Sequence, residues 1–224
     1  MTREGGKGVA LLPDSRPRLG RRWSDPEIRR SNNGVDLPDE EIAVIHRSDG
    51  SGTTWVWSDF LSKFSAAWST LIDRGTSLRW PAGTGAQGNE GVVEAVQNTA
   101  NSIGYVELAY AIQHRLSFAA VRNRSLEFLR ADLDSVAQAV KGSGVPGESK
   151  PSITDPPGKN AYPIAAYTWI VIPAPNAEPA KRAAIRELLR WILTSGQKEC
   201  SALGYVPLPR DISDSQLRTL DALP

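Results

Sequence analysis

The chain has 224 residues, of which 40% are hydrophobic and 23% are charged, enough apolar content to bury the core of one or two globular domains. Its formal net charge of +1 gives no general reason to expect nucleic acid or an anionic membrane as a partner. A single cysteine, Cys200, excludes an internal disulfide, and His46 and His114 stand too far apart, without acids at ligand spacing, to predict a metal site.

Residues 1–22 are predicted to form an irregular or disordered tail, because they are rich in Gly, Pro and Arg. The arginines in this tail are therefore assigned no nucleic-acid role. Residues 1–13 carry no apolar stretch after their charges, so a secretory signal is not expected there, and no apolar run approaches the ~20 residues that span a bilayer. Ordered structure is expected from Trp23, with Ser24 capping a short helix that has Pro26 in its first turn.

The segment from Ile42 to Thr54 predicts a buried strand, a polar loop and the start of a helix. β-Branched and apolar residues at 42–45 favour the strand. Ser51 or Thr53 can cap the helix, while Gly50 and Gly52 allow a sharp turn and the close approach of a ligand. Apolar residues at helical spacing predict that one helical face continues through Trp57, Phe60, Leu61, Phe64, Trp68 and Leu71.

This junction of strand and helix predicts a site for an oxyanion. The first N–H groups of a helix lack partners within the helix and lie at the positive end of its dipole, which favours a bound anion. Arg47 adds a planar fork of donors that matches two oxygens of a phosphate or a carboxylate. Asp49 is expected to hold that fork in place. On spacing alone, an ordinary capped turn with a surface ion pair between Arg47 and Asp49 explains the pattern equally well.

Further strand and helix patterns alternate along the chain and predict an α/β fold with a largely parallel sheet. Residues 142–160 are rich in Gly, Pro, Ser and Lys and predict a linker. Of the seven tryptophans, Trp57 and Trp68 are expected on a buried helix face and Trp169 in a buried strand, and Cys200 is expected to be a free buried thiol. The expected strands are 77–80, 103–106, 116–121 and 167–172. The expected helices are one that contains Val92, Val93 and Val96, and those at 108–113, 132–141 and 179–195, with Gly196 ending the last.

The stretch from Gly83 to Gly88 matches the G-x-G-x-x-G pattern of dinucleotide-binding loops, and Glu107 stands at about the distance of the acid that binds a ribose. The preceding strand is short and Pro81 interrupts its entry, which argues against a mononucleotide-binding unit. These glycines are therefore interpreted as a tight turn that lines a cleft.

Five blocks of sequence, in order, resemble the phosphate-binding proteins of bacterial phosphate ABC transporters. They are Val44–Thr54, Trp80–Gly91, Ser102–Glu107 with Tyr110, Tyr162–Ile164 and Gly204–Pro209. The resemblance runs from about Trp23 to the C-terminus and implies an α/β, periplasmic-binding-protein-like (type II) architecture of two lobes, incomplete here, with a mostly parallel central sheet. It also implies that the chain is the family's C-terminal portion, without an N-terminal segment that supplies the opposite wall of the cleft and a carboxylate for the phosphate proton.

By this resemblance the chain binds inorganic phosphate without changing it, as the substrate-binding component of a phosphate ABC transporter. Arg47, Ser51, Gly52 and Thr53 would bind the phosphate, and Asp49 would orient Arg47. No catalytic residue, metal, cofactor or nucleic acid is expected. The expected partners are inorganic phosphate, a membrane permease, and a missing N-terminal segment or complementing chain.

The resemblance divides the chain into the tail 1–22, a phosphate-binding lobe 23–160 and the C-terminal part of a second lobe 161–224. It implies a periplasmic or cell-surface location, and a cytoplasmic one if the start of the chain is genuine. Without the N-terminal segment we expect weaker phosphate binding, poorer selectivity over sulfate, and instability or self-association. The alternatives are a phosphate sensor or interaction module, an inactive fragment, a dinucleotide-binding enzyme, and a phosphate-ester hydrolase with Ser51 as nucleophile and His46 as the nearest base.

Overall fold

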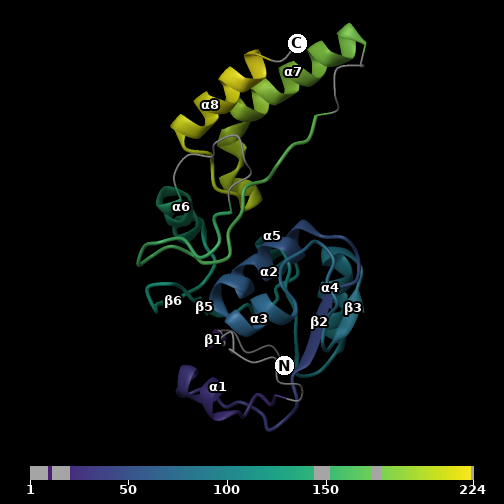
Figure 1. Ribbon diagram of the computed structural model, residues 1–224, viewed down its shortest axis with the longest axis vertical. Coiled ribbons are helices and arrows are strands. Elements are labelled where there is room, and N and C mark those ends of the chain that lie inside the picture. Colours follow the sequence, from purple (N-terminus) through teal and green to yellow (C-terminus); the bar gives the residue numbers. More distant parts are fainter. Residues whose placement is uncertain (1–9, 12–20, 144–151, 173–177, 223–224) are drawn as a thin grey trace. The chain divides into compact units, whose positions relative to one another are not determined.

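The computed structural model describes residues 10–11, 21–143, 152–172 and 178–222 (Figure 1). These residues form two compact units. Unit 1 comprises 10–11, 21–143 and 152–166, and unit 2 comprises 167–172 and 178–222. In these ranges, none of the helices combines the length and the apolar character that crossing a bilayer requires. Most of the expected tail, and the linker residues 144–151, lie outside the described ranges.

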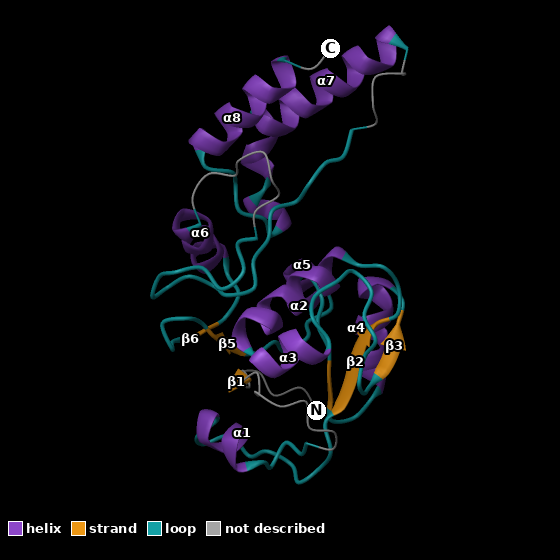
Figure 2. Cartoon of the chain, in the orientation of Figure 1, coloured by secondary structure: helices purple, strands orange, loops and turns teal. Residues whose placement is uncertain are grey.

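A three-stranded parallel sheet forms the part of unit 1 that carries the anion loop. Its strand order is β3-β2-β4, with β2 (Ala43–Arg47) in the centre, β3 (Thr84–Ala86) on one side and β4 (Ser102–Ile103) on the other. Helix α4 (Gly88–Asn98) packs against β2 (Figure 2). Its valines at 92 and 93 are buried. Successive strands are joined by segments that contain helices, which confirms the predicted α/β class. The register pairs Ile45 with Thr84, His46 with Gly85, Arg47 with Ala86, Ala43 with Ser102, and Val44 with Ile103.

A second three-stranded sheet in unit 1 has the order β1-β5-β6. Strand β1 (Ala10–Leu11) runs parallel to β5 (Ala120–Arg122), and β6 (Phe128–Leu129) runs antiparallel to β5. Three of the four described strand pairings in unit 1 are therefore parallel, as the sequence predicted. Helix α6 (Leu133–Gly142) follows, and a capping box between Asp132 and Ser135 closes its N-terminus.

The helix after the anion loop is shorter than predicted. Helix α2 (Gly52–Phe64) ends at Ser65, whose extended backbone starts a separate helix, α3 (Ala66–Leu71). The Ser65 hydroxyl accepts the Trp68 N–H at 3.2 Å, so this side chain caps α3 and offers the backbone an alternative to helix continuation. The predicted single face therefore breaks, and Leu71 is 69% exposed.

Among the described residues of unit 1, buried side chains gather in two clusters. Phe60 and Leu61 of α2 pack with Val121 of β5, and partly buried Trp57 and Trp68 cover this cluster. The other cluster consists of Trp23, Ile28 and Leu37, and it includes α1 (Pro26–Ser31). Pro26 begins α1 as predicted, but the N-cap is Asp25, because the Ser24 hydroxyl donates to the Asp39 carboxylate instead.

Several predicted strands differ in position. Residues 77–80 form no strand, and the strand that pairs with β2 lies further on, inside the glycine stretch. Strand β4 ends at Ile103 and β5 covers only Ala120–Arg122, so both are shorter than their apolar runs. Helix α5 (Leu108–Gln113) has the predicted bounds.

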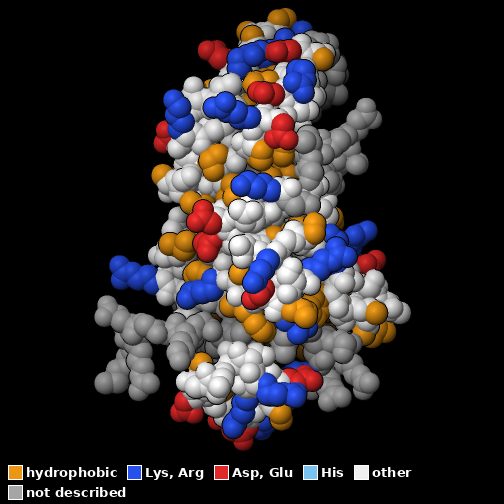
Figure 3. Space-filling view, turned by 90° about the vertical axis from the view of Figure 1, so that its left-hand side faces the viewer, with side chains coloured by type: hydrophobic (Ala, Val, Ile, Leu, Met, Phe, Trp, Pro, Cys, Tyr) orange, Lys and Arg blue, Asp and Glu red, His pale blue; other side chains and the backbone are white. Residues whose placement is uncertain are grey.

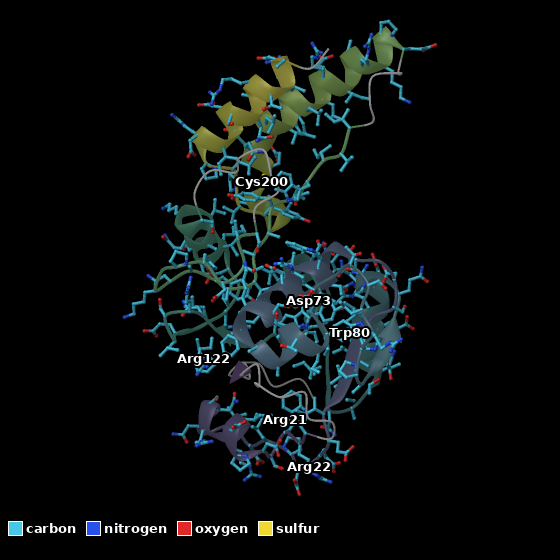
Figure 4. All side chains as sticks on the ribbon, in the orientation of Figure 1. Arg21, Arg22, Asp73, Trp80, Arg122 and Cys200 are labelled. Carbon is cyan, nitrogen blue, oxygen red and sulfur yellow. The ribbon has the colours of Figure 1, made fainter. Side chains whose placement is uncertain are left out.

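Unit 2 is helical in its described part. Helices α7 (Pro179–Leu193) and α8 (Arg210–Asp221) pack together, and an ion pair joins Arg190 to Asp221. Two short 3-10 turns, Ser195–Glu199 and Ser201–Leu203, connect them, so α7 ends before Gly196. Cys200 (Figure 4) is free and only partly buried, not fully buried as predicted.

The predicted buried strand at 167–172 is wrong. These residues form no strand, and the side chains at 169–172 are 40–78% exposed. Trp169 is therefore not a core residue, although its ring contacts Tyr167 edge to face. The charged side chains of both signs are interspersed on the face shown in Figure 3, in keeping with the small net charge.

Candidate anion-binding site

The junction between β2 and α2 has the strand, loop and helix order that the sequence predicted. Ser51 is the N-cap of α2, with an extended backbone, and its hydroxyl oxygen accepts the Thr54 N–H at 3.1 Å. The Ser51 N–H donates to the Thr76 carbonyl at 2.8 Å, and the Ser48 N–H donates to the Ala86 carbonyl at 3.0 Å. The loop is thus fixed to neighbouring backbone on both sides of Asp49.

Two backbone donors at the start of α2 are not engaged. The Thr54 N–H is taken by the Ser51 hydroxyl, and the Trp55 N–H bonds to the Ser51 carbonyl at 3.1 Å. The N–H groups of Gly52 and Thr53 find no acceptor among the residues that the structure describes. α2 is 13 residues long, so these donors lie at the positive end of a substantial helix dipole.

Asp49 holds the Arg47 side chain by two hydrogen bonds. Arg47 Nε donates to Asp49 Oδ1 at 2.7 Å, and Nη2 donates to Oδ2 at 2.5 Å. Asp49 Oδ1 also accepts the N–H of Gly88, the first residue of α4, at 3.1 Å. The hydrogen bonds from Arg47 and then from Gly88 hold the pKa of Asp49 well below its usual range. Asp49 is therefore ionised at neutral pH, where it can pair with the Arg47 guanidinium.

The clamp leaves part of the Arg47 guanidinium for a ligand. The group has five N–H donors, of which two go to Asp49. A third points toward Asn89 Oδ1, 3.5 Å from Nη1. The hydrogen bond to Asp49 raises the pKa of Arg47, and only 10% of its side chain is exposed. Arg47 is thus a fixed, permanent positive charge with two donors unassigned.

Open space lies over the two loop glycines. A Cβ built on Gly50 or on Gly52 meets no atom within 4 Å. Neither residue has a positive φ, so the chain does not need glycine here to turn, contrary to the sequence-based argument. What glycine provides at position 52 is open space above the start of α2.

The glycine stretch at 83–88 contributes a strand to the sheet. Residues Thr84–Ala86 form β3, whereas a dinucleotide fingerprint requires a turn that follows a strand. A Cβ on Gly83 would lie 2.7 Å from the Val44 carbonyl oxygen, and one on Gly85 would lie 3.0 Å from the Ser48 Cβ. These glycines therefore let β3 pack closely against the end of β2. The predicted tight turn is wrong for residues 84–86, which form a strand, and the dinucleotide alternative gains no support from this arrangement.

His46 is placed for packing and not for catalysis. Its ring stacks on Trp80 (Figure 4) with centroids 4.7 Å apart, and Nδ1 lies 3.1 Å from the Arg47 carbonyl oxygen. No hydrogen bond joins His46 to Ser51, both of which lie in the described range 21–143. His46 is therefore not placed as a base for Ser51. The described ranges also hold no group of three or more His, Cys, Asp or Glu side chains that could bind a metal.

Sequence reasoning missed three groups beside Arg47. These are the Gly88 N–H, the Asn89 side chain and Tyr105, whose hydroxyl accepts the Arg47 N–H at 3.1 Å. All three residues lie within two of the blocks that carry the family resemblance. That was the available signal, because nothing in their own spacing connects them with position 47.

Sequence reasoning also missed a buried carboxylate in the middle of α2. Asp59 is fully buried and forms ion pairs with Arg74 at 2.7 Å and Lys63 at 3.1 Å. Its Oδ2 accepts the hydroxyls of Ser152 and Thr154, each at 2.5 Å. Burial alone would raise the pKa of Asp59, but these hydrogen bonds lower it to about 2. The network ties residues 152–154 to α2, the helix at whose N-terminus the candidate site lies.

Comparisons with known proteins place this arrangement in a family. Residues 19–195 match the family model described as the PBP superfamily domain. The phosphate-binding protein PstS of Xylella fastidiosa is 40% identical over 193 residues, which cover 85% of this chain and 53% of the relative. PstS of Pasteurella multocida is 36% identical, with coverages of 86% and 56%, and PstS of Methanocaldococcus jannaschii is 35% identical, with coverages of 90% and 57%. The chain spans about half the length of the curated relatives it matches.

Solved structures share the fold. A high-affinity periplasmic phosphate-binding protein (PfluDING) bound with phosphate aligns with a TM-score of 0.57 at 16% identity, covering 82% of this chain and 59% of that one. A human phosphate-binding apolipoprotein aligns with a TM-score of 0.56 at 17% identity, covering 81% and 60%. These identities are low, so the likeness concerns the backbone architecture.

Proposed function

Because this chain belongs to the PBP superfamily, we propose that it binds inorganic phosphate at the junction of β2 and α2 and releases it chemically unchanged. The observation that carries the proposal is the Arg47 guanidinium, clamped by Asp49 at the end of the strand that leads into two unengaged helix N–H groups. Relatives of 35–40% identity are named phosphate-binding proteins, which supports phosphate as the anion.

The roles follow from the chemistry of the donors. The two unassigned donors of Arg47 would meet one edge of the phosphate. The N–H groups of Gly52 and Thr53, with the Thr53 hydroxyl, would donate to its other oxygens at the helix N-terminus. The Ser51 hydroxyl accepts the Thr54 N–H, so its own proton is available to the same ligand. Asp49 makes no contact with the phosphate in this arrangement and orients Arg47.

The clamp also explains why an acid can stand beside an anion site. Both Asp49 oxygens already accept N–H groups from Arg47, and one accepts a third from Gly88. The carboxylate is therefore neutralised locally by a guanidinium and by the N-terminus of α4. Engaged in this way, Asp49 is also a poor acceptor for the proton of hydrogen phosphate. We accordingly expect only modest selectivity of this chain for phosphate over sulfate.

The cellular context is proposed from the relatives. We place the phosphate site in a lobe formed by residues 23–160 and assign residues 161–224 to a second lobe. The activity would be that of the substrate-binding component of a phosphate ABC transporter, with a membrane permease as partner. A periplasmic or cell-surface location goes with that role, and a structural neighbour is described as periplasmic.

Isothermal titration calorimetry with phosphate and with sulfate tests the function. Arg47→Lys keeps the charge but removes the planar guanidinium and its two hydrogen bonds to Asp49. We therefore expect the phosphate affinity to fall about tenfold to hundredfold. Arg122→Lys is the matched control, because Arg122 (Figure 4) is a partly buried arginine at the last position of another strand, β5. We expect it to bind phosphate as the wild type does.

Three results would contradict the proposal. Absence of phosphate binding by the folded wild-type chain would favour an inactive fragment. Equal losses in Arg47→Lys and Arg122→Lys would mean that the anion does not depend on the clamped guanidinium. Turnover of a phosphate ester by the wild type would contradict the assignment of binding without chemistry.

A further inference from the structure

The end of β2 extends beyond its neighbour β4. Strand β4 stops at Ile103, opposite Val44, while β2 continues to Arg47. The N–H groups of a strand alternate in direction, and the Ala43 N–H donates to Asn101 on the β4 side at 3.1 Å. The Arg47 N–H, four residues on, points to the same side, where no strand remains. The Tyr105 hydroxyl takes its place as acceptor at 3.1 Å.

The same hydroxyl reaches the first turn of α2. Tyr105 Oη lies 2.8 Å from Thr54 Oγ1. Since Oη accepts the Arg47 N–H, its own proton is available to donate to Thr54. One phenol oxygen therefore links the last residue of β2 to the third residue of α2, across the loop that carries Asp49. These are the two elements that supply the proposed phosphate donors.

Two aromatic contacts restrain the ring of Tyr105. It stacks against Trp57 with centroids 5.8 Å apart and an interplanar angle of 14°, and against Trp80 at 5.8 Å and 30°. The backbone before it is equally confined, because a Cβ on Gly104 would lie 2.9 Å from Val92 Cγ1. The hydroxyl is therefore held by the aromatic stack and by close packing against α4. Burial raises the pKa of Tyr105, so the phenol is neutral at physiological pH.

We propose that Tyr105 is a positioning residue of the anion site, whose hydroxyl sets the distance between the Arg47 guanidinium and the N-terminus of α2. This inference rests on the proposed phosphate function. Donors from a strand end and from a helix start must converge on one small tetrahedral anion, and binding falls when such donors are misplaced by a fraction of an ångström. The Arg47–Asp49 clamp fixes the guanidinium within its loop, and the Tyr105 link fixes that loop to the helix.

Tyr105→Phe tests the link because it keeps the aromatic stack and deletes only the hydroxyl. We expect phosphate affinity to fall about fivefold to tenfold, as two hydrogen bonds are lost. The amide proton of Arg47 should shift upfield in the NMR spectrum, because its acceptor is gone. Tyr162→Phe is the matched control. Tyr162 packs on the Phe60 cluster, where burial raises its pKa to about 12. Its substitution should leave the phosphate affinity and the chemical shift of the Arg47 amide proton unchanged.

Substitution of Thr54 tests the link from its other end. Thr54→Val removes the partner hydroxyl in a side chain of the same shape, and we expect a similar loss of phosphate affinity. Thr54→Ser restores a hydroxyl and should recover most of it, whereas a purely steric role of Thr54 would make valine the better replacement. In a double-mutant cycle, Tyr105→Phe with Thr54→Val should cost little more than either change alone.

The outcomes separate this inference from the function on which it rests. If the wild-type chain binds no phosphate, both are refuted. If the wild type binds phosphate and Tyr105→Phe binds it as tightly, only the positioning role is refuted. Should Tyr105→Phe fail to fold, Thr54→Val and Thr54→Ser decide the question alone, and equal affinities in those two variants would overturn the role.

Discussion

Gly52→Ala separates the stability of the chain from its affinity for phosphate. Gly52 is the first residue of α2, and a Cβ built there meets no atom within 4 Å. Alanine should therefore fit the folded chain without strain. Because alanine also restricts the unfolded chain, we expect the free energy of unfolding to stay the same or to rise by up to about 1 kcal/mol.

The same methyl group should weaken the binding of phosphate. Cβ atoms in an α-helix tilt toward its N-terminus, so the new methyl would project into the space that the phosphate is proposed to occupy. A phosphate displaced from the N–H groups of Gly52 and Thr53 loses charge-assisted hydrogen bonds worth about 1.5–3 kcal/mol each. Partial loss of both gives about 2 kcal/mol, or roughly a thirtyfold rise in the dissociation constant.

Calorimetric titration with phosphate and thermal unfolding of the same samples provide the measurement. Gly50→Ala is the matched control, since a Cβ at that position also meets no atom within 4 Å but lies in the loop, two residues before α2. We expect Gly50→Ala to alter affinity by less than threefold or so. Wild-type affinity in Gly52→Ala would refute the placement of phosphate over the start of α2, even if the chain binds phosphate elsewhere.

Two further changes test the loop and the helix that it precedes. Ser51→Ala removes the cap that accepts the Thr54 N–H, so we expect a loss of about 1 kcal/mol in unfolding free energy together with weaker phosphate binding. Ser51→Thr is the control and should retain the cap. An unchanged melting temperature in Ser51→Ala would contradict the capping role. Asp59, with a folded pKa of about 2 against 3.8 when unperturbed, stabilises the fold above about pH 4 and loses this contribution as the pH falls toward 2. The difference in unfolding free energy between the wild type and Asp59→Asn, measured by urea titration, should therefore shrink by about 2 kcal/mol over that window, and a constant difference would contradict the assignment.

The sequence predicted those parts of the site that depend on near neighbours. Arg47 and Asp49 are two residues apart, and their contact follows from strand geometry and opposite charge. The cap of α2 lies three residues from the N–H that it accepts, which is a local pattern as well. The bounds of α5 were likewise predictable, because a short helix there depends on its own apolar spacing.

The predictions that failed depend on contacts between residues that are distant in the sequence. Gly83 and Gly85 resemble a nucleotide loop until the close approach of β2 is known, and that contact spans about forty residues. Tyr105 meets Arg47 across 58 residues, so no local pattern indicates it. Residues 167–172 have the apolar, β-branched composition of a strand, yet they pair with no strand among the described residues. Strand propensity alone does not supply a partner.

The buried carboxylate of Asp59 bears on the order in which the protein is made. Its hydroxyl donors, Ser152 and Thr154, follow it by 93 and 95 residues. A ribosome therefore delivers α2, with the ion-pair partners Lys63 and Arg74, long before these two hydroxyls, and until they arrive the buried carboxylate lacks two of its four side-chain partners. The hydrogen-bond set of this carboxylate, which anchors α2, is therefore complete only after about two-thirds of the chain has been synthesised.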